Sequence, residues 1–87
     1  MHYPVTTPGQ LRAVLAAMRR ARKLTQAQLG ERLGVSQKRI ARIEGQPAVT
    51  SFDQIARMVS AMGGRLVVEE AEEVGVRRQP PTKHPRW

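Results

Sequence analysis

The stretch from Thr25 to Glu44, TQAQLGERLGVSQKRIARIE, restricts the fold of this chain more than any other part of the sequence. Two short amphipathic segments lie on either side of a Gly34-Val35-Ser36 break. Their apolar positions are Leu29, Leu33, Val35, Ile40 and Ile43. Gly30 stands where two steeply crossing helices would approach closely, and Gly34 can end the first helix because glycine tolerates a positive φ. The pattern predicts two short helices packed around a tight turn.

Capping side chains mark the starts of the helices predicted along the chain. Thr7 with Gln10, and Thr25 with Gln28, have the spacing of a capping box, and Ser36 can cap the third helix. A fourth helix is expected to begin near Thr50 or Ser51 and to end at Gly63-Gly64. Its expected inner face consists of Phe52, Ile55, Ala56, Val59 and Met62. These signals predict a helical domain over residues 8–63, preceded by an arm over residues 1–7.

The spacing of apolar residues changes after Gly63-Gly64. Residues 65–70, RLVVEE, are rich in β-branched side chains and too short for a stable helix, so they predict a strand. The sequence offers no second strand, and an unpaired strand leaves its backbone groups without partners. We therefore expect residues 64–71 to pair across a homodimer through Leu66, Val67 and Val68. An extended segment lying on the helices is the alternative.

Charge and composition narrow the class of function. The 87 residues carry a net charge of +8, all of it within residues 1–65, as expected for a protein that binds a polyanion. The absence of cysteine excludes disulfides and thiolate metal sites. We expect no signal peptide, no membrane span and no cofactor, and a cytoplasmic location. His2 and His84 stand in the expected flexible ends, so the sequence does not predict an enzyme.

The last part of the chain, residues 72–87, is charged and rich in proline, which predicts a flexible tail. Trp87 is the only tryptophan. A large aromatic side chain after a solvated tail can anchor in a partner's pocket, although it can also remain in solvent or act as a degradation signal.

The two helices around the turn have the pattern of a helix-turn-helix motif. A small residue at the crossing, a turn former and apolar positions on both sides are all present. The second helix carries Gln37, Lys38, Arg39 and Arg42, side chains that pair with adenine and guanine edges. We therefore expect it to lie in a DNA major groove. A helical bundle that does not bind DNA is the alternative.

Residues from about 8 to 62 resemble the lambda-repressor-like, XRE-type DNA-binding fold, and LTQAQLGERLGVSQKRIARIEG follows that family's signature. The resemblance implies that Gln26 contacts a phosphate and supports the recognition helix. It places Gln37, Lys38, Arg39 and Arg42 at base edges, with Ser36 beside them in the DNA-binding set, and it pairs Arg19 with Glu44.

The whole chain resembles HipB-type antitoxins in length, in a strand directly after the helices, and in a tail that can end in tryptophan. That resemblance implies a dimeric autorepressor on a palindromic operator, which also neutralises a HipA-type serine/threonine kinase toxin. Two alternatives remain: a stand-alone repressor with no toxin, and a protein-bridging module on the same fold. The fold expected overall is a mainly α helix-turn-helix bundle with one strand pairing across a homodimer.

Overall fold

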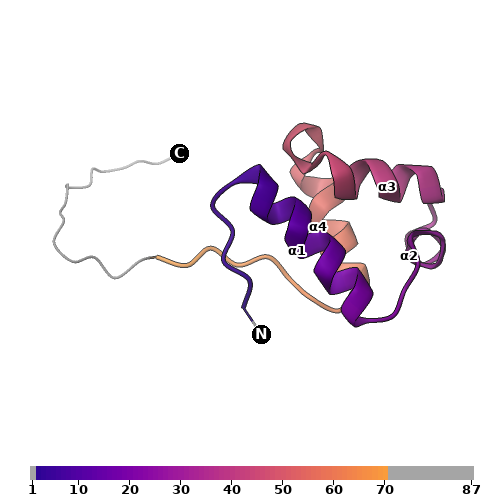
Figure 1. Ribbon diagram of the computed structural model, residues 1–87, viewed down its shortest axis with the longest axis horizontal. Helices are drawn as coiled ribbons and strands as arrows, with labels where there is room; N and C mark the ends of the chain where they lie inside the picture. Colours follow the sequence, from indigo (N-terminus) through magenta and orange to yellow (C-terminus); the bar gives the residue numbers. More distant parts are fainter. Residues whose placement is uncertain (1, 71–87) are drawn as a thin grey trace, which may run out of the picture.

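The computed structural model describes residues 2–70, and in this range the chain forms four α-helices and one short 3₁₀ helix (Figure 1). The elements are α1 (Pro8–Ala21), α2 (Gln26–Leu33), α3 (Gln37–Gly45), η1 (Pro47–Val49) and α4 (Phe52–Ala61). None of the helices in residues 2–70 is long and apolar enough to cross a membrane. The predicted tail, with His84 and Trp87, lies outside the described residues.

The four helices begin where the capping side chains predict. Thr7 and Thr25 each form the predicted capping box, and their hydroxyls accept hydrogen bonds from the backbone N–H groups three residues later. Ser36 and Ser51 cap α3 and α4 in the same way. Helix α2 ends at Gly34, which has a φ of 74°. The 3₁₀ turn at Pro47–Val49 was not predicted, because its three residues are too few to show a hydrophobic period.

Each α-helix contributes apolar side chains to one core. Its buried members are Leu15, Met18, Leu29, Ile40, Ile43, Ile55, Met58, Val59 and Met62. The expected burial of Phe52 was wrong, since this side chain is 72% exposed. Phe52 is the first residue of α4, and the buried stripe of that helix begins one turn later, at Ile55.

The crossing of α2 and α3 depends on a glycine. A Cβ atom at Gly30 would lie 2.7 Å from the carbonyl oxygen of Val35 and 3.2 Å from that of Ser36. The same backbone is held by a hydrogen bond of 2.9 Å from the Val35 N–H to the Gly30 carbonyl. The close approach predicted at Gly30 is therefore confirmed.

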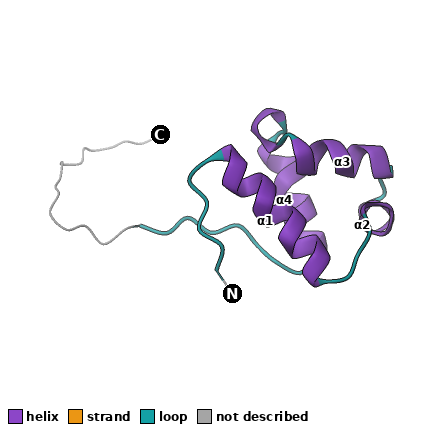
Figure 2. Cartoon of the chain, in the orientation of Figure 1, coloured by secondary structure: helices purple, strands orange, loops and turns teal. Residues whose placement is uncertain are grey.

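Residues 64–70 leave the end of α4 without regular secondary structure (Figure 2). The strand predicted over residues 65–70 is not formed within the single chain, because a strand requires a neighbour and residues 2–70 supply none. Leu66, Val67 and Val68 are 42%, 66% and 99% exposed. Pairing with a second copy stays a prediction.

Replacing Gly30 with alanine should destabilise the domain by about 1–3 kcal/mol, since the new methyl group meets backbone atoms that cannot rotate away. Chemical denaturation followed by circular dichroism measures the change. Gly9→Ala is the matched control, because its Cβ would find only the Thr7 hydroxyl, at 3.9 Å. That variant should gain at most about 0.5–1 kcal/mol, the full effect of helix propensity in a helix interior, because Gly9 is the second residue of α1. Equal stabilisation of both variants would contradict the close approach.

Candidate nucleic-acid interface

Helix α3 buries one side and exposes the other. Ile40, Ile43 and Glu44 are buried. Lys38 and Arg42 each lie two residues from Ile40, a rotation of about 200° around the helix, so both are on its outer side. They are one turn apart and therefore adjacent. Both are exposed, so α3 presents two neighbouring cations to solvent.

The other predicted DNA-binding residues flank this outer side. Gln37 and Arg39 are exposed. Gln37 lies three residues before Ile40 and Arg39 one residue before it, so the two side chains are on opposite flanks of α3. Ser36 is also exposed, and its hydroxyl accepts a hydrogen bond from the Arg39 backbone N–H at 3.1 Å. The exposed set therefore extends from the N-cap of α3, Ser36, to Arg42 in its last turn.

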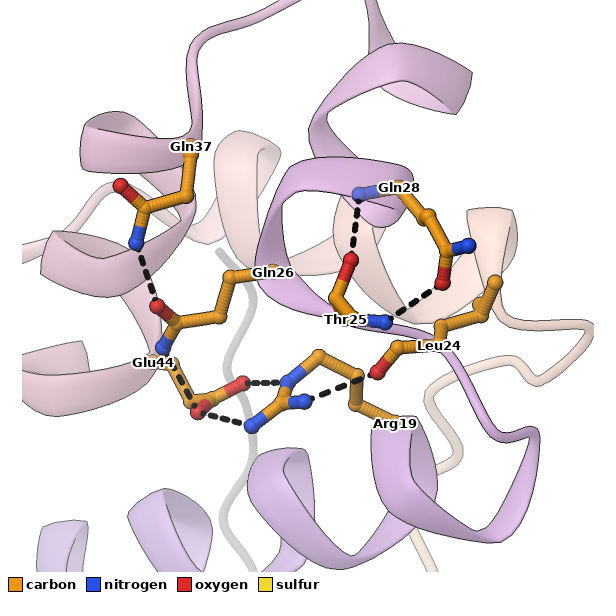
Figure 3. Close-up of polar contacts among 7 residues, drawn as sticks. All are labelled: Arg19, Leu24, Thr25, Gln26, Gln28, Gln37 and Glu44. Atoms are coloured by element: carbon orange, nitrogen blue, oxygen red, sulfur yellow. Dashed lines mark hydrogen bonds and ion pairs between the residues drawn. The ribbon is translucent and has the colours of Figure 1, made fainter.

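A polar network joins α3 to the two helices before it (Figure 3). The guanidinium of Arg19 donates from Nε to Glu44 Oε2 at 2.7 Å and from Nη2 to Glu44 Oε1 at 3.1 Å. Its Nη1 donates to the carbonyl of Leu24 at 2.8 Å. One arginine thus holds α3 and the segment between α1 and α2 at the same time.

The network continues from Glu44 towards the outer surface. Gln26 Nε2 donates to Glu44 Oε1 at 3.2 Å, and Gln26 Oε1 accepts from Gln37 Nε2 at 2.6 Å. An amide nitrogen carries two N–H groups, so Gln37 keeps one N–H and its oxygen for another partner. In Figure 3 that oxygen points away from Gln26. Gln37 is therefore held in place while its adenine-pairing groups remain free.

Glu44 stays ionised within this network. Burial on its own would raise the pKa of the Glu44 carboxyl, since its side chain is only 9% exposed. Hydrogen bonds from Arg19 and Gln26, and the positive charges of Arg19 and Arg20, outweigh burial and hold that pKa below its usual value. The hydrogen bonds to Glu44 raise the pKa of Arg19 in turn, so the pair is charged at neutral pH.

The helix N-termini near this surface keep their partial positive charge. The first turns of α1, α2 and α3 contain no acidic residue, and among the described helices only α4 has one, Asp53. An acidic side chain there would offset the dipole and repel an anion. The positive ends of α2 and α3 are therefore available to a phosphate group.

The structure brings together part of the predicted set. Arg19, Gln26, Gln37 and Glu44 form one connected network, whereas Arg39 lies on the other flank. There it lines a shallow hollow together with Leu33, Val35, Ile43, Asp53, Gln54 and Arg57. Leu66 to Val68 belong to the segment after α4, and Trp87 lies outside the described residues.

Sequence reasoning missed Gln54 and Arg57 as neighbours of Arg39, and Leu24 as an acceptor for Arg19. The Ser51 cap placed the start of α4, but its position beside α3 depends on the crossing of helices, which no local signal reports. The Leu24 contact is made by a backbone carbonyl and leaves no trace in residue type.

The family model for the helix-turn-helix domain matches residues 10–73. The chain therefore belongs to the helix-turn-helix domain family. A solved complex of a HipB variant with an O2 20mer has the same fold, with a TM-score of 0.74 at 21% identity. The match covers 83% of this chain and 100% of that chain. Among the curated proteins, none shows significant similarity to this chain.

Replacing Glu44 with glutamine should cost about 3 kcal/mol of stability near neutral pH, because it leaves the Arg19 guanidinium without its counter-charge. The pKa of the Glu44 carboxyl is lower in the folded protein than in the unfolded chain. The stability that the Glu44–Arg19 pair contributes is therefore fully present above about pH 4.3, the usual pKa of a glutamate, and is lost as the pH falls through the lower, folded pKa. The two proteins should therefore converge in stability in acid. Urea unfolding over a pH series measures the difference, and a difference independent of pH would contradict the charged pair.

Proposed function

We propose that this protein binds double-stranded DNA as a transcriptional regulator, with α3 in the major groove. The observation that carries the proposal is the exposed outer side of α3, where Lys38 and Arg42 are adjacent and Gln37 is held by Gln26. Membership of the helix-turn-helix family supports it. The net charge of +8 on residues 1–65 would attract the phosphate backbone.

The exposed side chains are suited to different parts of the groove. Arginine and lysine pair with guanine N7 and O6, and glutamine pairs with adenine through one N–H and its oxygen. Arg39, Arg42 and Lys38 would therefore recognise guanine, and Gln37 adenine. Gln26, Ser36 and the N-termini of α2 and α3 would contact phosphates and set the register of the protein on the duplex.

The regulator would act as a homodimer on a palindromic operator. Two copies of α3 related by a two-fold axis would recognise half-sites about 34 Å apart, one helical turn of DNA. The exposed Leu66–Val68 segment, which has no partner strand in residues 2–70, supports dimerisation. In a bacterial cell this protein would be cytoplasmic and associated with the nucleoid when bound to its operator.

The repressor would also be the antitoxin of a toxin-antitoxin pair, with a HipA-type serine/threonine kinase as the toxin. The sequence resemblance to HipB-type antitoxins supports this part, and the shared fold with HipB is consistent with it. Trp87 would insert in a pocket of the kinase. A stand-alone repressor would share the DNA-binding half and need no role for the tail.

Arg39→Ala and Arg42→Ala should each weaken binding to the operator by about 1–3 kcal/mol if each arginine makes a bidentate contact to guanine. Fluorescence anisotropy with a labelled duplex measures the affinity. Arg12→Ala on α1 removes the same charge from an exposed position, so it controls for net charge. Wild-type affinity in both α3 variants would exclude these residues from recognition. Saturation at one protein chain per duplex would exclude the dimer.

Binding of the kinase toxin should change the emission of Trp87, which is the only tryptophan in the chain and therefore an unambiguous reporter on the antitoxin side. The titration is followed by difference emission against the kinase alone. Trp87→Ala should weaken the complex by at least about 2 kcal/mol if the indole is an anchor. Unchanged emission together with unchanged affinity in this variant would refute the anchor, while leaving DNA binding untouched.

A further inference from the structure

Residues 65–70 follow α4, and their backbone hydrogen-bonding groups have no partner among residues 2–70. The last backbone hydrogen bond after α4 runs from the Gly64 N–H to the Val59 carbonyl, and residues 65–70 make none with other described residues. Leu66, Val67 and Val68 are exposed on the same segment. Arg65 and Glu69 are exposed as well, and neither forms an ion pair within residues 2–70. Within the described part of the chain, the backbone, apolar and charged groups of this segment therefore have no partner.

Symmetry restricts how this segment can pair with a second copy. In an antiparallel pair, residues directly opposite each other place their side chains on the same face of the sheet. A two-fold axis that relates two antiparallel strands is perpendicular to the sheet and keeps each residue on its face. Neighbouring residues point to opposite faces, so the axis must place one residue opposite its own copy. Only registers centred on a single residue are allowed.

Charge selects one of these registers. With Val67 at the centre, Arg65 lies opposite Glu69 of the partner subunit, and the pair occurs twice. With Leu66 at the centre, Arg65 faces a valine, and Glu69 faces Gly63 across the pair. With Val68 at the centre, Val67 faces a glutamate. Unlike charges opposite one another stabilise a strand pair, so the sequence RLVVE is complementary to itself only around Val67.

We propose that residues 65–69 form a self-complementary antiparallel strand pair with a second copy of this chain, with Val67 at the two-fold axis and Arg65 paired to Glu69 of the partner subunit. This inference rests on the proposed homodimer and adds its register. Leu66 and Val68 then lie opposite each other across the pair, and both point to one face. Within residues 65–69 that face carries only apolar side chains, while the opposite face carries the ion pairs around Val67.

Single cysteines test the register, because the natural sequence contains none. Directly opposite residues have Cα atoms about 4.5–5.5 Å apart, within the range of a disulfide. The copies of Leu66, or of Val68, would be diagonal neighbours about 7–8 Å apart, which is beyond that range. Val67→Cys should therefore form a crosslinked dimer under mild oxidation, and Leu66→Cys should not.

A mixture of two single variants completes the cysteine test. Equal amounts of Leu66→Cys and Val68→Cys should crosslink to each other, since Leu66 of one copy faces Val68 of the other in the proposed register. Non-reducing electrophoresis measures the dimer band in each case. Crosslinking of Leu66→Cys alone at the rate of Val67→Cys would overturn the register.

Charge reversal tests the ion pairs. Arg65→Glu places two glutamates opposite each other at both ends of the pair, and Glu69→Arg places two arginines there. Each variant should weaken self-association about tenfold, measured by sedimentation equilibrium. An equimolar mixture of the two should recover the wild-type association, because every facing pair is again unlike. Glu70→Arg is the control, since it would face Gly64 of the partner subunit and should leave association unchanged.

Failure of this inference can be distinguished from failure of the proposed function. A dimer that binds operator DNA but shows no rescue in the mixture has another register or interface. A protein that binds DNA only as a monomer lacks the strand pair altogether. A dimer with the expected crosslinks that does not bind DNA would refute the proposed function and retain the strand pair.

Discussion

The position of the exposed side of α3 depends on the close approach of α2 to the backbone of the turn that follows it. With only a hydrogen atom at Gly30, the α2 backbone lies against the carbonyls of Val35 and Ser36. This contact determines where α3 starts and how it crosses α2. The crossing in turn places Glu44, near the end of α3, within reach of Gln26 at the start of α2. The polar contacts that join α2 to α3 therefore depend on the steric requirement for glycine at position 30.

The buried carboxylate of Glu44 contributes more to geometry than to net stability. Removing a carboxylate from water costs several kcal/mol, and well-formed ion pairs roughly offset that cost. Glu44 accepts two hydrogen bonds from Arg19 and one from Gln26, which come from different helices. A purely apolar contact would tolerate rotation of α3 about its axis, whereas these directional bonds do not. They also hold Gln26 in the orientation from which it positions Gln37.

Much of this arrangement could be predicted from the sequence, and the limits have physical causes. Helix starts at Thr7, Thr25, Ser36 and Ser51 are predictable because a cap acts on backbone groups only three residues away. Phe52 was misplaced because hydrophobic periodicity does not tell where along a helix packing begins. The link between Gln26 and Gln37 joins two helices, so it depends on their crossing. The predicted pairing of residues 66–68 involves a second copy of the chain, so the structure of one chain does not test it.

Residues 65–70, which follow α4, would affect how repression depends on the concentration of the protein. Within residues 2–70 their backbone has no hydrogen-bond partner. If they pair with a second molecule as proposed, the concentration of the assembled dimer would depend on the square of the monomer concentration. If only dimers occupy the operator, repression would change more steeply with protein level than for a monomeric binder. A modest fall in synthesis would then release the promoter over a narrow range of concentration. The short exposed run after Gly64 would thereby control how sharply the gene responds.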